Sequence, residues 1–179
     1  MNSDAMISIV FLLIFATLMF YLAYRGFKKQ SAVKNAKMNI SQRLGATMNA
    51  TLKHTEGLPL APGVLVDVYY GPERIAFVKD KQEISISTNK ITSIDCVTGQ
   101  NIKSQQMAGA ATGKYVFGGM TGAVIGSLVA TTTYLVISYT SEGKDKYVML
   151  DTYVSGMFAR KVQKDFAKTS TATAKSIEL

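Results

Sequence analysis

Cysteine and histidine are nearly absent from this chain of 179 residues, which holds one of each, Cys96 and His54. A disulfide framework needs paired cysteines, and a structural zinc site needs about four Cys or His ligands. Both kinds of site are therefore excluded, and we expect no metal ion and no cofactor. A single unpaired cysteine is typical of a protein in a reducing compartment.

Charged residues are scarce as well, at 18% of the chain, against roughly 25% in average soluble proteins. The carboxylates are scattered over predicted turns and strand ends, and no spacing pairs two of them for acid-base catalysis. His54 has no nucleophile or metal ligand beside it, and the serines and threonines have no positioned base. Because no catalytic constellation emerges, we expect that the chain is not an enzyme.

Acidic residues are missing between residues 25 and 55, where seven basic residues lie. A nucleic-acid site spreads its basic residues over a groove or sheet with aromatic residues between them. Here they form a short block directly after an apolar segment, so we expect no nucleic-acid partner. Near an anionic membrane surface, each Lys or Arg contributes about 1 kcal/mol. We predict contact with anionic lipid headgroups by Arg25, Lys28, Lys29, Lys34 and Lys37.

Charge is also absent from residues 5–24, which include the apolar run MISIVFLLIFATLMFYLAY. About 20 helical residues span about 30 Å, the thickness of the hydrocarbon core of a bilayer. The run predicts a single transmembrane anchor over residues 1–24. A cleaved signal peptide is the alternative, but it requires basic residues before the run and a small-residue cleavage site after it. By the positive-inside rule, the basic block predicts an outer N-terminus and a cytoplasmic domain at the inner membrane.

Residues 30–53 carry apolar side chains at spacings of three or four, which is typical of one face of a helix. These are Val33, Ala36, Ile40, Leu44, Met48 and Leu52. We predict a basic juxtamembrane helix or linker over residues 25–55. Two interpretations stay open: a solvated helix or partly flexible stalk, and an amphipathic helix that self-associates or contacts headgroups.

After a loop over residues 56–63, with Pro59 and Pro62 as breakers, the apolar period changes from helical to alternating. This pattern predicts strands near residues 64–69, 75–77, 84–86, 91–97, 134–139 and 146–150, the last two forming a hairpin around Glu142 and Gly143. Residues 153–168 predict a closing helix, with Arg160, Lys161, Lys164 and Asp165 opposite an apolar face. That face consists of Val154, Met157, Phe158, Val162 and Phe166. We expect a disordered tail over residues 169–179.

The short meander strands, the strand ending in ITSIDCV, the late hairpin and the final helix resemble the bacterial pleckstrin-homology-like domains, close to the GRAM type. The opening HTEGLP and the glycine-rich insert look like one subgroup of them. The resemblance covers residues 54–168 and implies an α+β fold, a partly open antiparallel barrel capped by the helix, over a domain at 56–168. Six strands are evident where the parent fold has seven. The first hairpin loop has a single basic residue, Arg74, so phosphoinositide binding is not implied; bacterial members look like oligomerisation or docking modules.

Glycines recur every four residues before the last hairpin, at Gly109 and Gly113 and again at Gly118, Gly122 and Gly126. Glycines four apart lie on one side of a helix and let another helix approach closely. We predict a glycine-zipper helical hairpin over residues 107–132 that makes oligomer or membrane contact through these five glycines. Each arm of about 13 residues, or about 20 Å, is too short to cross a bilayer, so the hairpin is re-entrant or buried in an oligomer. A flexible loop is the alternative, and it would expose an apolar patch.

Two functions fit these features. The first is a membrane-anchored, self-associating scaffold whose pleckstrin-like module serves as a docking surface, which implies a homo-oligomer, membrane lipid and a possible protein partner. The second is a membrane-active effector or channel component whose glycine-zipper hairpin enters the bilayer. The sequence names no specific partner for either function.

Overall fold

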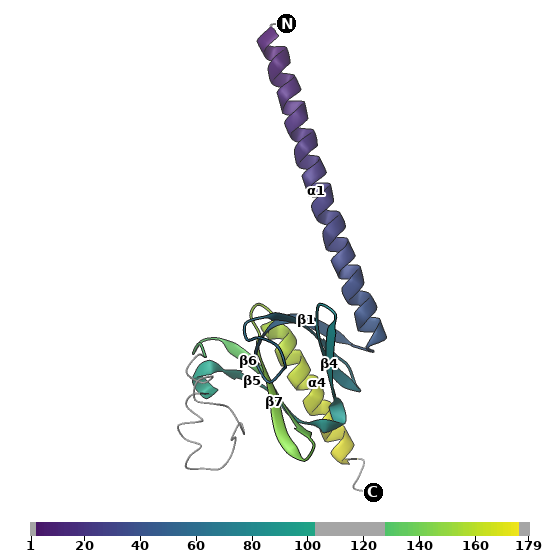
Figure 1. Ribbon diagram of the computed structural model, residues 1–179, viewed down its shortest axis with the longest axis vertical. Helices are drawn as coiled ribbons and strands as arrows, with labels where there is room; N and C mark the ends of the chain where they lie inside the picture. The colour runs from purple at the N-terminus through teal and green to yellow at the C-terminus, as the bar shows by residue number, and fades with distance from the viewer. Residues whose placement is uncertain (1–2, 103–127, 176–179) are drawn as a thin grey trace. The chain divides into compact units, whose positions relative to one another are not determined.

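The computed structural model describes residues 3–102 and 128–175, and the chain divides into two compact units, Met1–Arg43 and Leu44–Leu179 (Figure 1). The first unit is a single helix, α1 (Ser3–Arg43). The second unit contains strands, one short 3-10 helix and a C-terminal α-helix. Its described elements are β1 (Met48–Glu56), β2 (Leu65–Tyr70), β3 (Arg74–Lys79), β4 (Gln82–Ser87), η1 (Thr88–Lys90), β5 (Ile91–Thr98), β6 (Thr133–Ser141), β7 (Lys144–Asp151) and α4 (Gly156–Lys175).

The prediction of a transmembrane anchor over residues 1–24 is wrong. Among the described residues, no helix combines the length and the apolar character that crossing a membrane requires. Such a span needs about 20 successive apolar residues. α1 is 41 residues long, but it continues without a break into the basic block, so the apolar run is one part of a helix of mixed composition. The inner-membrane location and the outward N-terminus were derived from that anchor and are overturned with it.

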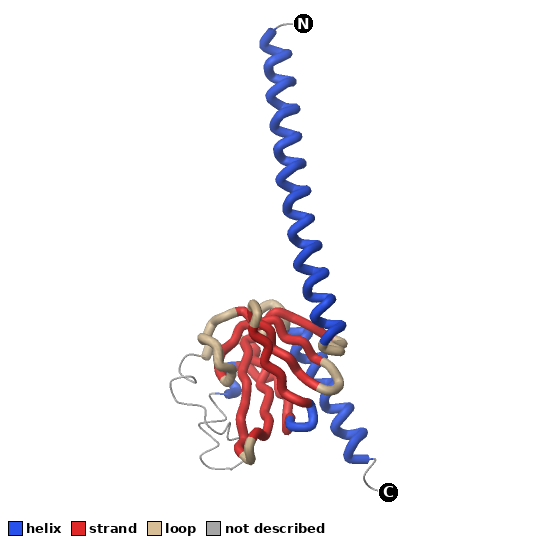
Figure 2. The backbone as a smooth tube through the Cα atoms, turned by 45° about the vertical axis from the view of Figure 1, so that its right-hand side comes forward, coloured by secondary structure: helices blue, strands red, loops and turns tan. Residues whose placement is uncertain are grey.

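The seven strands form one antiparallel sheet in the order β4-β3-β2-β1-β7-β6-β5. The strands curl around a common interior instead of lying flat (Figure 2). This partly open sheet with its C-terminal helix fits a pleckstrin-homology-like barrel. Every neighbouring pair except β1 and β7 is consecutive in the sequence, so that pair alone joins the first four strands to the last three.

The alternating patterns predicted strands β2 to β7, and these are confirmed. The turn of the last hairpin lies at Glu142 and Gly143, as predicted. The β3–β4 turn has Asp80 at φ 54°, and the β6–β7 turn has Glu142 and Gly143 at φ 56° and 71°. Positive φ at both central residues is the geometry of the tight turns that match the twist of antiparallel strands.

The strand that the sequence analysis missed is β1. The helical face predicted over residues 30–53 does not extend beyond Arg43, where α1 ends. From Met48 onward the chain is extended, and Leu52 and His54 point into the barrel. A spacing of four residues fits either structure, because positions four apart share one face of both a helix and a strand. The compact domain therefore begins at Leu44 and not at residue 56.

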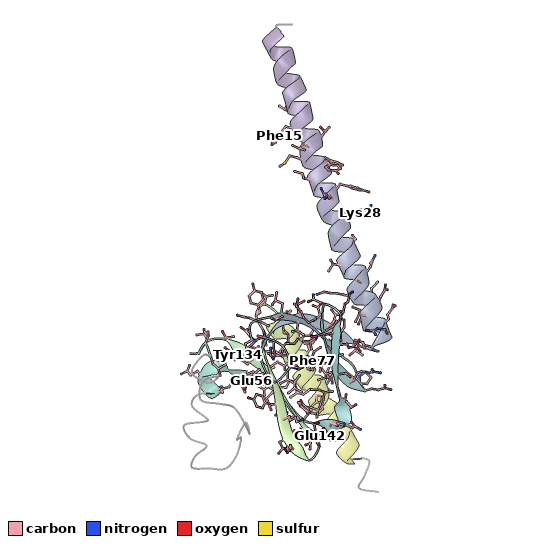
Figure 3. The ribbon with its side chains drawn as sticks, viewed as in Figure 1. Phe15, Lys28, Glu56, Phe77, Tyr134 and Glu142 are labelled. Carbon is pink, nitrogen blue, oxygen red and sulfur yellow. The ribbon has the colours of Figure 1, made fainter. Side chains whose placement is uncertain are left out.

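The core lies between the inner face of the sheet and helix α4. Alternate residues of neighbouring strands fill it, and Phe77 and Leu135 are among the fully buried ones (Figure 3). Helix α4 contributes four side chains to this core, namely Phe158, Ala159, Val162 and Phe166. Two residues assigned to the apolar face of this helix, Val154 and Met157, are instead exposed. Helix α4 also continues to Lys175, so the residues after Lys168 that we expected to be disordered are helical up to that point.

Gly57 lets β1 approach β7 closely at the point where the two halves of the sheet join. The pairing shifts between His54 and Glu56, which marks a β-bulge, and the chain then turns at Gly57 with φ 94°. A Cβ atom at Gly57 would collide with the carbonyl oxygen of Tyr147 and lie 2.8 Å from the Cα of Val148. These are backbone atoms, so rotating a side chain cannot relieve the collision.

We predict that Gly57→Ala lowers the free energy of unfolding by about 3 kcal/mol or more, since the left-handed conformation and the collision add together. Gly143→Ala is the matched control, because Gly143 also has a positive φ but no atom lies within 4 Å of its Cβ position. The control should cost only about 1–2 kcal/mol. Urea unfolding of both variants measures the difference, and equal losses would contradict the proposed close approach.

Candidate interaction surfaces

Helix α1 exposes large apolar side chains along the part that precedes the basic block. Phe15 is a clear example in Figure 3. The run from Leu18 to Leu22 is exposed at every position, and each residue turns the helix by about 100°, so apolar side chains face outward in all directions. The residues involved are Leu12, Phe15, Leu18, Met19, Phe20, Tyr21, Leu22 and Tyr24, each more than half exposed.

Along one side of α1, two small residues are followed by aromatic residues. Ala16 and Thr17 lie one turn before Phe20 and Tyr21, and Tyr24 follows one turn later. Together these side chains line a shallow apolar hollow on the helix surface. A hollow bordered by larger side chains is the shape into which a side chain of a neighbouring helix inserts.

The five basic residues proposed for headgroup contact all lie on α1, but they do not share one face. At about 100° per residue, Arg25 and Lys28 lie on one side, whereas Lys34 and Lys37 lie on the other side. Arg25, Lys28 and Lys34 are exposed, and Lys37 is half-buried. A flat surface lying along the helix could therefore meet the first two or the last two of these four residues, but not all four together.

The five glycines of the predicted zipper fall in residues 103–127, outside the described part of the chain, and so does most of the predicted hairpin. The described ends of that segment lie together. The backbone N–H groups of Gly99 and Gln100 donate to the carbonyl oxygens of Thr132 and Ala130, each at 3.0 Å. Residues 128–132 form a loop and turn, where the hairpin prediction had extended its second arm.

These two ends pack into a second apolar cluster on the outer face of the sheet. Ile102 and Leu128 contact Tyr134, Val136 and Met149 there, and all five are buried. The hydroxyl of Tyr134 also accepts a hydrogen bond from the Val129 backbone at 3.1 Å. The two described ends that flank residues 103–127 are therefore held together at one place by packing and by hydrogen bonds.

Beside this cluster lies a polar pair, Glu56 and Tyr147, that no sequence pattern indicates. Burial raises the pKa of the Tyr147 hydroxyl, and the hydrogen bond and negative charge of Glu56 raise it further. The other carboxylate oxygen of Glu56, Oε2, is buried and has no hydrogen-bond partner among the described residues. The two residues are far apart in sequence and meet only because β1 pairs with β7.

The lone histidine organises a loop. His54 is buried, its Nε2 accepts a hydrogen bond from the Leu58 backbone, and its Nδ1 lies 3.2 Å from the carbonyl oxygen of Ala61. Because Nε2 accepts, Nδ1 carries the proton and donates. Both ring nitrogens are thus occupied by the loop that joins β1 to β2, so the ring holds local structure.

Cys96 lies half-buried on β5 against the main core. Burial raises the pKa of its thiol to about 11, an effect that the charge of Arg160 partly offsets and that of Asp95 increases. A thiol with a raised pKa carries little of the reactive thiolate at neutral pH. In the described ranges, no three His, Cys, Asp or Glu side chains gather in a group that could hold a metal ion.

The carboxylate of Asp165 on helix α4 lies near the phenol of Tyr70 on strand β2. Burial raises the pKa of Tyr70 to about 12, and the charge of Asp165 and its hydrogen bond to the hydroxyl contribute to the rise. Tyr70 is almost fully buried at the end of its strand. This contact lies between the helix and the half of the sheet formed by β1 to β4.

This link predicts an alkaline loss of stability. The unfolded tyrosine has the ordinary pKa of 10.0 and the folded one about 12, so the unfolded state loses its proton first and the free energy of unfolding falls as the pH rises from 10 to 12. Cys96 and Tyr147 also have raised pKa values and contribute to this fall, so Tyr70→Phe should remove only the share of Tyr70, and Asp165→Asn a smaller part of it. Urea unfolding across this range measures both effects, and an unchanged slope in Tyr70→Phe would contradict the link.

Comparison with known proteins assigns no family: no family model matches the chain, and no curated protein matches it. The order of the strands and the closing helix fit a pleckstrin-homology-like barrel. A fold of this kind does not specify a function, which has to be argued from the surfaces of the molecule.

Proposed function

We propose that this chain is a self-associating docking protein, in which α1 joins several copies and the barrel presents a surface to a partner. The observation that carries the proposal is the set of exposed apolar side chains on α1. Fully burying a Leu or Phe side chain is worth about 1.5–3 kcal/mol, so covering these residues supplies a large driving force for association.

The distribution of these side chains favours more than two copies. A dimer covers one stripe of each helix, whereas residues 18–22 of α1 are exposed in all directions. A helix that is apolar on every side is stable when other apolar surfaces surround it. Several copies of α1 packed around one another supply such surroundings, and the hollow between Phe20 and Tyr24 gives a neighbouring side chain a place to insert.

The positive charges of α1 affect whether its copies pack in parallel or antiparallel. Arg25 and Lys28 are exposed next to the apolar run. In a parallel assembly these cations of neighbouring copies lie close to one another, and their repulsion is screened by salt. In an antiparallel assembly they lie at opposite ends, and the effect of salt is small. Association that strengthens with salt supports the parallel arrangement.

Light scattering on the full chain, purified in a mild detergent, tests the proposal. We expect an oligomer larger than a dimer. The combined variant Phe15→Ala, Leu18→Ala and Leu22→Ala should raise the concentration for half-assembly about tenfold or more, because each substitution removes buried apolar surface. Alanine preserves the tendency to form a helix, and circular dichroism checks that the helix content is kept.

Leu65→Ser is the control, since Leu65 is an exposed apolar residue of β2 in the other unit. It should leave the oligomer unchanged. A chain that stays monomeric at every concentration, or an oligomer that tolerates the triple alanine variant, would overturn the proposal.

A further inference from the structure

The outward face of helix α4 carries a row of basic side chains that the core does not use. Arg160, Lys161, Lys164 and Lys168 are all exposed, and their spacing of three or four residues places them on one side of the helix. Met157 begins the same row. We call these five residues the α4 stripe; from end to end it spans about 16 Å, at 1.5 Å per residue. It lies opposite Ala159 and Val162, which face the core.

An exposed apolar group stands at the beginning of this stripe. Tyr153, Val154 and Met157 are 68%, 83% and 78% exposed, and we call them the apolar tip. Core packing does not explain their character, because none of them belongs to the buried clusters. Exposed apolar side chains gathered beside polar ones are typical of interaction sites.

The backbone that carries the apolar tip is held in place. The hydroxyl of Thr152 donates to the carbonyl oxygen of Thr133 at 2.9 Å, and the Tyr153 backbone donates to the Asp151 carboxylate at 2.7 Å. Ser155 donates to the carbonyl oxygen of Thr51 at 3.4 Å. The tip is thus fixed to both β1 and β6, so little ordering entropy remains to be lost when a partner binds.

Among the described residues, Lys79 pairs with Asp80 and Lys146 with Glu142, and neither of these ion pairs involves a cation of the stripe. The one carboxylate on α4 near these cations is that of Asp165, which lies beside the stripe. The stripe therefore presents four cations against one carboxylate, a net positive charge, directly beside an apolar anchor point.

We propose that the apolar tip and the α4 stripe bind an acidic segment of a partner protein, one that places an apolar side chain on the tip and carboxylates along the stripe. Charge complementarity selects the acidic character of the partner. The apolar tip gives the contact a desolvated centre. Because the cations of the α4 stripe lie to one side of the tip, they set the direction in which the acidic segment of the partner lies.

An elongated polypeptide fits this pattern better than an anionic lipid surface does. A helix that lies on a bilayer inserts apolar side chains along its whole length. On the exposed side of α4 the large apolar residue is Met157, at one end, and Asp165 flanks the cations. A peptide segment can place its single apolar anchor and its following carboxylates in the same order as the tip and the stripe.

This inference gives a partner to the docking role in the proposed function, but it does not depend on self-association through α1. The probe is a fluorescein-labelled synthetic helical peptide with two leucines in its first turn and four glutamates at three- and four-residue spacing after it. Its matched control peptide has glutamine in place of each glutamate. Fluorescence anisotropy with the full chain measures binding of both peptides.

We expect the acidic peptide to bind and its glutamine version to bind about tenfold more weakly. The combined variant Arg160→Gln, Lys161→Gln and Lys164→Gln should reproduce that loss, and Val154→Ser with Met157→Ser should weaken binding of both peptides. Raising the salt from about 0.05 M to about 0.5 M should weaken binding of the acidic peptide only.

The control variant is Lys81→Gln, Lys90→Gln and Lys144→Gln, which removes the same charge from exposed positions elsewhere on the domain. It should bind the peptide as the parent chain does. Equal loss in this control would overturn the proposal, because the binding would then follow net charge alone.

Two other results would also overturn it. One is binding of phosphatidylglycerol vesicles that depends on the stripe while the acidic peptide does not bind. The other is a stripe variant that changes the oligomer measured by light scattering, which would make the stripe a contact between copies. If the parent chain forms the oligomer but does not bind the acidic peptide, this inference fails while self-association stands. If the parent chain binds the peptide but stays monomeric, the reverse holds.

Discussion

The pairing of β1 with β7 is the contact on which the rest of the domain depends. The strands on either side of this pair are joined in sequence order, so each meander could form on its own. Only β1 against β7 turns two meanders into one curled sheet with a shared interior. The contact is made by few residue pairs and includes a bulge, and Gly57 allows the backbones to approach closely just beyond it. Close packing of this kind leaves no space for even one added methyl group.

Several other features follow from that junction. It brings Glu56 beside Tyr147, it lets His54 hold the following loop, and it forms the enclosed face that α4 covers. The outer face of β6 and β7 is covered in a different way, by Ile102 and Leu128 at the two ends of the glycine-rich segment. The sheet is therefore packed on both faces over its second half, with the main core on one side and the small cluster on the other.

The surfaces that we propose for interaction lie outside the main core. The apolar residues of α1 and the basic row of α4 are not part of that core, and covering the exposed apolar residues would be favourable. Residues of this kind are usually retained for binding. The barrel supplies a rigid support, and the two helices carry the surfaces with which the protein is proposed to meet copies of itself and a partner.

The sequence by itself determined the period of six strands, their turns and the closing helix, because side-chain alternation and turn residues are local signals. It did not determine β1, where a spacing of four residues suits a strand and a helix equally. It wrongly made the apolar run a membrane anchor, since composition in a short window does not reveal that α1 continues as one helix to Arg43. Only the tertiary structure decided that Val154 and Met157 face outward and that Tyr70 meets Asp165, because such contacts depend on how distant segments pack and no local pattern encodes them.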